Sequence, residues 1–142
     1  MATIEELVES ERPRLAKRAW AIFNDEKNKA LAAELANVDH TSLRTLLTAF
    51  DHACCLEEVC LVLRYKGGRD GARMTANLVQ ALLKQFEEVA VAVGDRVAAT
   101  DADRAKAKLV AGLFTFVIME HKWQCEFARA SQPAGDGRRP GR

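Results

Sequence analysis

Apolar residues recur at every third or fourth position along most of this chain, which is the spacing of one face of an α-helix. The most regular stripe consists of Met74, Leu78, Leu82, Phe86, Val89 and Val93. Glycines interrupt the pattern in few places, chiefly at the Gly67-Gly68 pair and at Gly94, which closes or kinks this stripe. The pattern therefore predicts helices joined by short links.

The first part of the chain is expected to form two helices. Thr3 and Glu6 have the spacing of a capping box, so a helix should begin at this point. Proline lacks a backbone N–H and is tolerated in the first turn of a helix or at a kink. We therefore expect Pro13 to interrupt the first helix and a second one to begin near Ser10 or Glu11.

One long helix is expected in the middle of the chain, from a cap at Thr41 or Ser42 to about Tyr65. Between Ala53 and Leu63 it is apolar almost all round. Such a helix usually contacts neighbours on several sides, so this one is predicted to be central.

Two more helices are expected beyond the glycine pair. Asp70 is the predicted cap of the first. Thr100 or Asp101 should cap the second, which should end near Ala130.

Length and composition agree with a small helical domain. The chain has 142 residues, and its 49% of hydrophobic residues is enough to build a core. We therefore predict an all-α fold, a single-domain antiparallel bundle of four to five helices over residues 1–130. Residues 131–142 are rich in Gly, Pro and Arg and are predicted to be a disordered basic tail.

Charge limits the kind of nucleic-acid binding that is possible. The 21 basic and 20 acidic residues give a formal net charge of +1, so any nucleic-acid site must be a local patch. One basic cluster lies between Arg12 and Arg18, with no acidic residue before Asp25, and a second surrounds the glycine pair beside Tyr65. Basic side chains can contact a phosphate backbone and a tyrosine can stack on a base, although a solvated surface with ordinary salt bridges is the alternative. The predicted nucleic-acid-binding residues are Arg14, Lys17, Arg18, Arg64, Lys66, Arg69 and Arg73.

No catalytic motif accompanies these clusters. The glycine-rich turn lacks a preceding strand and the Lys-Ser/Thr of a phosphate-binding loop, so it is expected to be a plain turn. Neither a Gly-x-Ser-x-Gly elbow nor a pair of Glu-x-x-His motifs occurs. We therefore expect a protein that is not an enzyme and that needs no cofactor.

Two histidine–cysteine pairs allow a weaker alternative, a metal-binding bundle with a tetrahedral zinc site. His52 and Cys55 are three residues apart on one expected helix. His121 and Cys125 are four residues apart on another. The simpler interpretation, which we favour, is that no metal binds and that the cysteines fill core space as reduced thiols.

The chain shows no pattern typical of secretion or membrane insertion. Residues 1–8 are amphipathic and acidic, unlike a signal peptide, and the longest apolar run, Leu109 to Met119, is too short to span a bilayer. We expect a cytoplasmic protein without a membrane partner.

Three stretches resemble a known family. Thr41-Ser42-Leu43-Arg44 with Leu46-Leu47 is similar to the opening of its central helix. Leu61 to Arg69 is similar to the end of that helix and the following turn. Glu120-His121-Lys122-Trp123 and Phe127 to Ala130 are similar to its closing helix. The family is the small helical subunit of type III CRISPR effector complexes, in its Cmr and Csm forms. Both forms stay open, because the Gly-Leu pair frequent in the Cmr form is absent from Ala53-Cys54-Cys55-Leu56.

The resemblance implies a non-catalytic role in a ribonucleoprotein that serves antiviral defence. Its partners would be other subunits of a CRISPR effector complex, copies of itself, and guide and target RNA, whose backbone the basic residues would contact. A helical adaptor that binds only protein is the alternative, with an association surface around Leu56, Val59 and Leu63.

Overall fold

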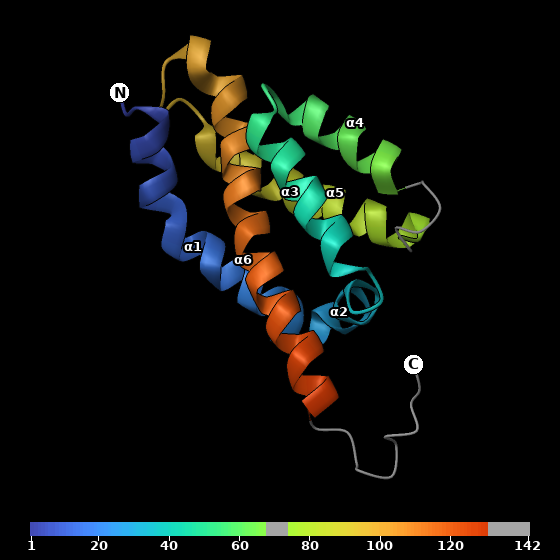
Figure 1. The fold of residues 1–142 in the computed structure, drawn as a ribbon. Coiled ribbons are helices and arrows are strands. Elements are labelled where there is room, and N and C mark those ends of the chain that lie inside the picture. The colour runs from blue at the N-terminus through green and yellow to red at the C-terminus, as the bar shows by residue number, and fades with distance from the viewer. Residues whose placement is uncertain (68–73, 131–142) are drawn as a thin grey trace.

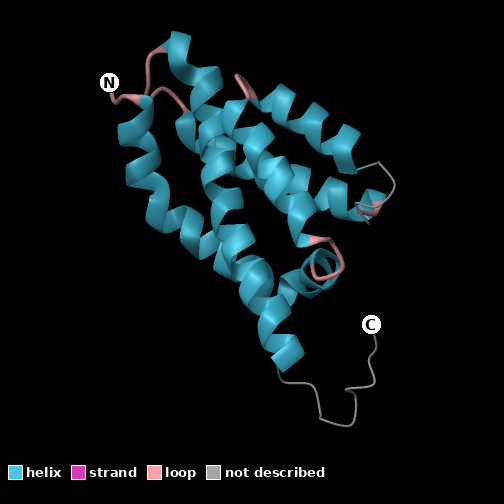
Figure 2. Cartoon of the chain, viewed as in Figure 1, coloured by secondary structure: helices cyan, strands magenta, loops and turns pink. Residues whose placement is uncertain are grey.

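The computed structural model describes residues 1–67 and 74–130, with side chains as far as residue 127. The described residues form helices and connecting turns without a strand, apart from one isolated bridge between Ala2 and Val97 (Figures 1 and 2). The helices are α1 (Ile4–Asn24), α2 (Lys29–Leu35), α3 (His40–His52), α4 (Leu56–Gly67), α5 (Ala76–Ala90) and α6 (Ala102–Ala130). Short 3-10 turns η1 (Glu26–Asn28), η2 (Val91–Val93) and η3 (Ala99–Asp101) connect them. The predicted all-α, single-domain fold is confirmed, although the described residues form six α-helices rather than the four to five expected.

The long helices α1 and α6 run parallel, in contrast to the antiparallel order expected of the bundle (Figure 1). Their starts are joined because the Ala2 amide donates to the Arg96 carbonyl, N···O 2.9 Å, just before α6 begins. The two helices then stay close, since a side-chain carbon built on Gly112 would lie 3.0 Å from Leu15. Four helices separate α1 from α6 in sequence, so no short hairpin link dictates an antiparallel pair.

Helix α1 continues through Pro13, so the predicted interruption there is wrong. The capping box at its start is confirmed: the Thr3 hydroxyl accepts from the Glu6 amide, and the Glu6 carboxylate accepts from the Thr3 amide. Pro13 is exposed, so the carbonyl that loses its helical partner can face water. Leu7 and Leu15 are buried on either side of it, and this packing holds the helix together.

The expected long central helix is instead two helices, α3 and α4, which is a second correction. Ala53 is extended (φ −70°, ψ 146°) and its carbonyl accepts from Arg104 Nη1 at 3.2 Å. The Cys54 amide donates to Glu58 Oε1 at 2.8 Å, which satisfies a free donor before α4. The apolar pattern concealed this break. It also overstated burial, since Leu61 is 66% exposed.

Helix α5 carries the apolar stripe expected of it. The stripe residues Leu78, Leu82, Phe86, Val89 and Val93 are all buried. Its N-cap is Thr75, whose hydroxyl accepts from the Leu78 amide at 3.0 Å, rather than Asp70. Asp70 itself lies outside the described residues. Gly94 ends the η2 turn with φ +47°, a left-handed conformation that favours glycine, so its predicted role as a terminator is confirmed.

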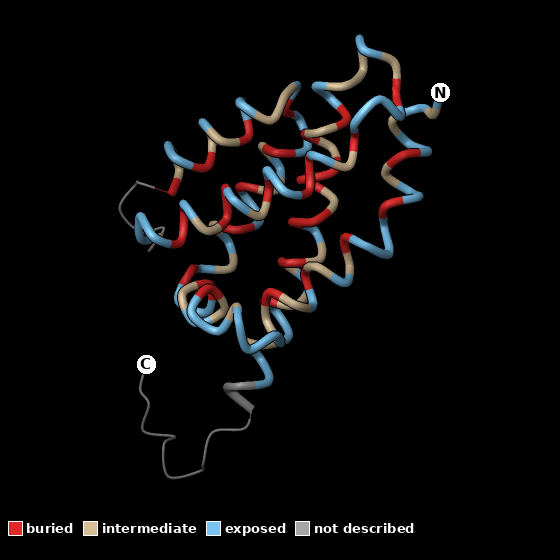
Figure 3. Tube along the Cα trace, turned by 180° about the vertical axis from the view of Figure 1, so that it is seen from behind, coloured by how far each residue is buried: buried red, intermediate tan, exposed pale blue. Residues whose placement is uncertain are grey.

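The core lies between α6 and the other helices, and Figure 3 shows buried positions along the inner side of each. Its centre is a group of three fully buried rings, Phe50, Phe86 and Phe114, that pack edge to face with centroids 5.0 to 6.0 Å apart. Helix α6 begins at Ala102 beside the expected caps and extends to Ala130, as expected. Among the described helices, none is long and apolar enough to cross a membrane.

Candidate nucleic-acid interface

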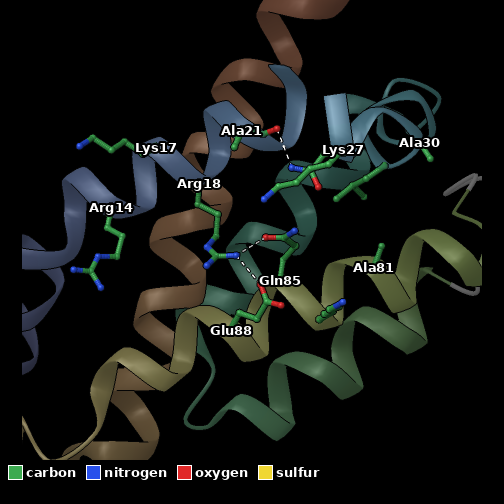
Figure 4. Close-up of a pocket in the computed structure, with 12 residues that line it drawn as sticks. Arg14, Lys17, Arg18, Ala21, Lys27, Ala30, Ala81, Gln85 and Glu88 are labelled. Carbon is green, nitrogen blue, oxygen red and sulfur yellow. Dashed lines mark hydrogen bonds and ion pairs between the residues drawn. The ribbon is translucent and has the colours of Figure 1, made fainter. Parts of the chain in front are cut away.

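A groove of about 710 Å³ lies between α1, the η1–α2 segment and α5 (Figure 4). Its wall of α1 carries Arg14, Lys17 and Arg18, three of the predicted nucleic-acid-binding residues. Lys27 of η1 and Lys84 of α5 add two more cations from the other walls. The groove is therefore lined by five basic side chains that come from three separate segments.

Small side chains keep the groove open between these cations. Ala21 of α1, Ala30 of α2 and Ala81 of α5 contribute to its lining, together with Leu31. At such positions the helices approach each other without large side chains filling the space between them. The result is a basic groove whose lining also contains small apolar side chains.

Arg18 is fixed on α5 rather than free in the groove. Its Nη1 donates to Gln85 Oε1 and to Glu88 Oε1, both at 2.9 Å (Figure 4). Its side chain is 32% exposed, so part of the guanidinium still faces solvent. Among the described residues that line this groove, Glu88 is the one carboxylate.

Arg14 shares a buried carboxylate with an arginine from the α5–α6 connection. Glu11 Oε1 lies 3.6 Å from Arg14 Nε, and Glu11 Oε2 lies 2.6 Å from Arg96 Nη1. The Glu11 side chain is only 7% exposed, and two arginines compensate its charge. Because two cations face one anion, Arg14 contributes a partial surplus of positive charge to the groove edge.

The three lysines supply the unpaired charge. Lys17, Lys27 and Lys84 form no ion pair with a carboxylate in the part of the chain that the structure describes. Lys17 and Lys84 stand on opposite walls, on α1 and α5. Long lysine side chains on two walls can meet phosphates at different points along a strand.

The second predicted cluster is elsewhere. Arg64 and Tyr65 are exposed and Lys66 is half-buried near the end of α4, and none of them lines the groove. Arg69 and Arg73 lie outside the described residues, as does the predicted tail of residues 131–142. The described residues of the two clusters therefore do not form one site.

Sequence reasoning found the α1 wall and missed the others. Lys27 and Lys84 are far from the cluster in sequence and only packing brings them beside it. The absence of acidic residues between Arg12 and Asp25 was also misleading, because Glu11 directly precedes Arg12 and pairs with Arg14, and Glu88 of α5 pairs with Arg18. The one available signal was that Lys84 lies off the apolar stripe of α5.

The four residues of the zinc alternative are not brought together. His52 is exposed and its Nδ1 lies 2.8 Å from the Thr48 carbonyl of its own helix. His121 does contact Cys125, with Sγ 3.7 Å from Nε2, but its ring stacks on His40. Among the described residues, no three His, Cys, Asp or Glu side chains are arranged to hold a metal ion.

None of the four cysteines forms a disulfide in the described structure, and they fill the core less completely than expected. Cys54 is exposed, and the other three cysteines are half-buried. Burial, helped by the charge of Glu87, raises the pKa of Cys60 above its ordinary value. That thiol is therefore protonated at neutral pH and is a poor nucleophile.

Comparison of the chain with protein-family models, with curated proteins and with solved structures gave no match. Inference about function therefore depends on this chain's own residues, above all on the basic groove between α1, η1–α2 and α5.

Proposed function

We propose that this protein is a non-catalytic helical subunit that binds the backbone of single-stranded RNA in the groove between α1 and α5. The observation that carries the proposal is the meeting of five basic side chains from three segments around one open channel, in a chain whose net charge is only +1. A local concentration of cations on a nearly neutral protein favours an anionic partner at that place.

The lining suits a phosphate backbone better than base edges. Lysine and arginine side chains predominate, and such contacts position a strand without reading its sequence. With Lys17, Lys27 and Lys84 unpaired, about three phosphates would be neutralised. Binding by the isolated subunit should then be weak, independent of sequence, and strongly dependent on salt.

The wider setting that we propose is a cytoplasmic type III CRISPR effector complex, in which copies of this subunit stack beside guide and target RNA. The sequence resemblance supports it, through the stretches at Thr41 to Leu47, Leu61 to Arg69 and Glu120 to Ala130. The α1 cluster that the resemblance implicates is one wall of the groove. Neutralisation of several phosphates per copy would accumulate along a filament, so weak single sites can produce firm binding.

The test is the salt dependence of binding to a labelled single-stranded RNA, followed by fluorescence anisotropy between about 50 and about 300 mM salt. For the original sequence, the logarithm of the binding constant should fall against the logarithm of salt with a slope of about −2, which corresponds to three phosphate contacts. The double variant Lys17→Gln with Lys84→Gln should reduce the slope by about 1.4 units, because one contact is lost on each wall.

Arg12→Gln is the matched control. Arg12 is on the same helix and its replacement removes one positive charge, but it pairs with Glu9 and does not line the groove. It should change the slope little. The single variants Lys17→Gln and Lys84→Gln are compared with it. If all three change the salt slope equally, only overall charge matters and the groove is not the RNA site.

A helical adaptor that binds only protein is the second candidate, and one observation favours it. Trp123 and Phe127 stack with centroids 4.6 Å apart near the end of α6, and each is 54% exposed. Exposed Met119 precedes them by one turn on the same face. Large aromatic side chains are frequent anchors of protein interfaces.

The surface first expected for such an adaptor is not available. Val59 and Leu63 are fully buried and belong to the core, because α4 packs its apolar face on α3, α5 and α6. Trp123→Ser therefore tests the adaptor better than changes at those positions. If it dissociates the purified assembly while RNA binding by the isolated chain is unchanged, the aromatic face joins protein subunits.

A further inference from the structure

His121 is the one histidine that the described structure buries, with 1% of its surface exposed. It projects from α6 toward the end of α2 and the turn that leads into α3. Its Nε2 lies 3.1 Å from the Leu35 carbonyl and 3.1 Å from the Val38 carbonyl. Its ring stacks on His40, with centroids 5.3 Å apart and planes 10° from parallel.

The hydrogen bonds assign a proton to each ring. Two carbonyl oxygens can only accept, so His121 must carry its proton on Nε2. Burial lowers the pKa of His121 and so favours its neutral ring, in which Nδ1 is an acceptor. His40 Nδ1, 3.1 Å away, then donates to it. In the neutral form of the pair, His40 therefore carries its proton on Nδ1 and keeps a lone pair on Nε2.

Protonation is tolerated at one ring and not at both. A proton added to Nε2 of His40 leaves its Nδ1–H donating to His121. A second proton must go to Nδ1 of His121, which would place two N–H groups and two positive charges against each other across 3.1 Å.

The surroundings oppose positive charge on the pair. Burial comes first in lowering the pKa of His121, and the neighbouring His40 lowers it further, against the two carbonyls and Asp39. Burial also lowers the pKa of His40, followed by Lys122 and Arg44, while Asp39 and Glu126 act in the opposite direction. These charged groups belong to the α2–α3 turn, α3 and α6.

We propose that His40 and His121 form a proton-sensitive latch that fastens the end of α2 and the α2–α3 turn to α6. In the neutral pair, three hydrogen bonds join segments more than 80 residues apart in sequence. Acidification breaks the contact between the rings and drives His121 out of its buried place, which loosens α2.

The sign of the effect follows from linkage. The folded chain binds these protons less readily than the unfolded chain, so the latch contributes fully above about pH 6.5 and is lost as the pH falls below that value. The unfolding equilibrium constant should rise by up to about tenfold per pH unit for each histidine whose pKa is lowered.

The experiment is urea unfolding of the full chain between about pH 8 and about pH 5.5 at constant ionic strength, a range above the titration of ordinary carboxylates. The original sequence should lose stability across this range. His40→Gln should reduce the dependence without abolishing it, because one titrating ring and its charge are removed while burial still opposes a charge on His121. His52→Gln is the matched control: it also removes a histidine, but an exposed one on α3, and it should leave the dependence unchanged.

Nitrogen-detected NMR of the unaltered chain provides a second measurement. It needs no variant, so a variant that fails to fold cannot affect the result. It should find His121 protonated on Nε2 and His40 on Nδ1 at neutral pH. An Nδ1–H form of His121 would overturn the assignment. The same pH dependence in His40→Gln as in the original chain would overturn the latch.

Discussion

The carboxylate of Glu88 offers the sharpest perturbation of the groove. It is the single acidic group among the lining residues that the structure describes, and it lies 2.9 Å from Arg18 Nη1. Glu88→Gln keeps the shape of the side chain and can still accept from Arg18, but it removes the negative charge. We expect RNA to bind more tightly, because a repulsive charge is lost and the charge of Arg18 is no longer balanced.

The magnitude follows from Coulomb's law. A phosphate on Arg18 would lie roughly 6 Å from the Glu88 carboxylate, and two unit charges at that separation repel by about 0.7 kcal/mol in water. The groove is open, so the solvent-like value is the better choice, and about twice it is a generous upper value for a partly screened site. The dissociation constant should therefore fall by about threefold to tenfold at low salt.

The free energy of unfolding should decrease slightly, although RNA binds more tightly. The Glu88 side chain is 45% exposed, and exposed ion pairs contribute about 0.2–1 kcal/mol. Thermal unfolding beside the anisotropy titration separates the two effects. Glu87→Gln is the matched control, because it makes the same charge change at the preceding residue, which does not line the groove. Unchanged or weaker binding in Glu88→Gln, or equal gains in both variants, would refute the reasoning.

Two further predictions concern the fold. Phe114→Ala removes the ring that packs on both Phe50 and Phe86 in the centre of the core, and it should lower the free energy of unfolding in urea by about 3–5 kcal/mol. A loss below about 1 kcal/mol would mean that the core collapses around the gap. Pro13→Ala restores a backbone N–H inside α1 and should raise the stability by about 1–3 kcal/mol in a thermal or urea titration. No gain would show that the helix is already adapted to proline.

Helix positions could be predicted where burial and local propensity agree. The stripe of α5 is buried as expected because one face of that helix meets the core and Gly94 closes it in a left-handed conformation. The capping box at Thr3 is likewise a local signal that needs no tertiary contact.

The errors came from positions where distant contacts decide. Pro13 lies inside α1 because the packing of α1 on α6 outweighs the backbone hydrogen bond that proline cannot form. The break after His52 depends on Glu58 and on Arg104, which is far away in sequence and binds the Ala53 carbonyl. Neither contact leaves a mark in apolar periodicity.

The candidate site was half predictable for the same reason. A run of basic residues on one helix is visible in a sequence, so the α1 wall was found. The opposing Lys84 and the pairing of Arg18 with Glu88 exist only after α1 and α5 pack. The contact of His121 with Cys125 on its own helix follows from their spacing, but the contact with His40 does not, since helical spacing places residues on one face without saying which helix that face meets.

The parallel course of α1 and α6 has a practical consequence for labelling. Helix α6 has 29 residues, which at about 1.5 Å per residue gives a rod of roughly 43 Å. The N-terminus is tied to the start of that rod through Ala2 and Arg96, and it lies at the end of the bundle far from α2 (Figure 1). A fluorophore before the exposed Met1 therefore stands clear of the aromatic stack and of the His40–His121 pair. Paired with a second dye in the last turns of α6, it reports by energy transfer whether that far end moves while the start of the rod stays fixed.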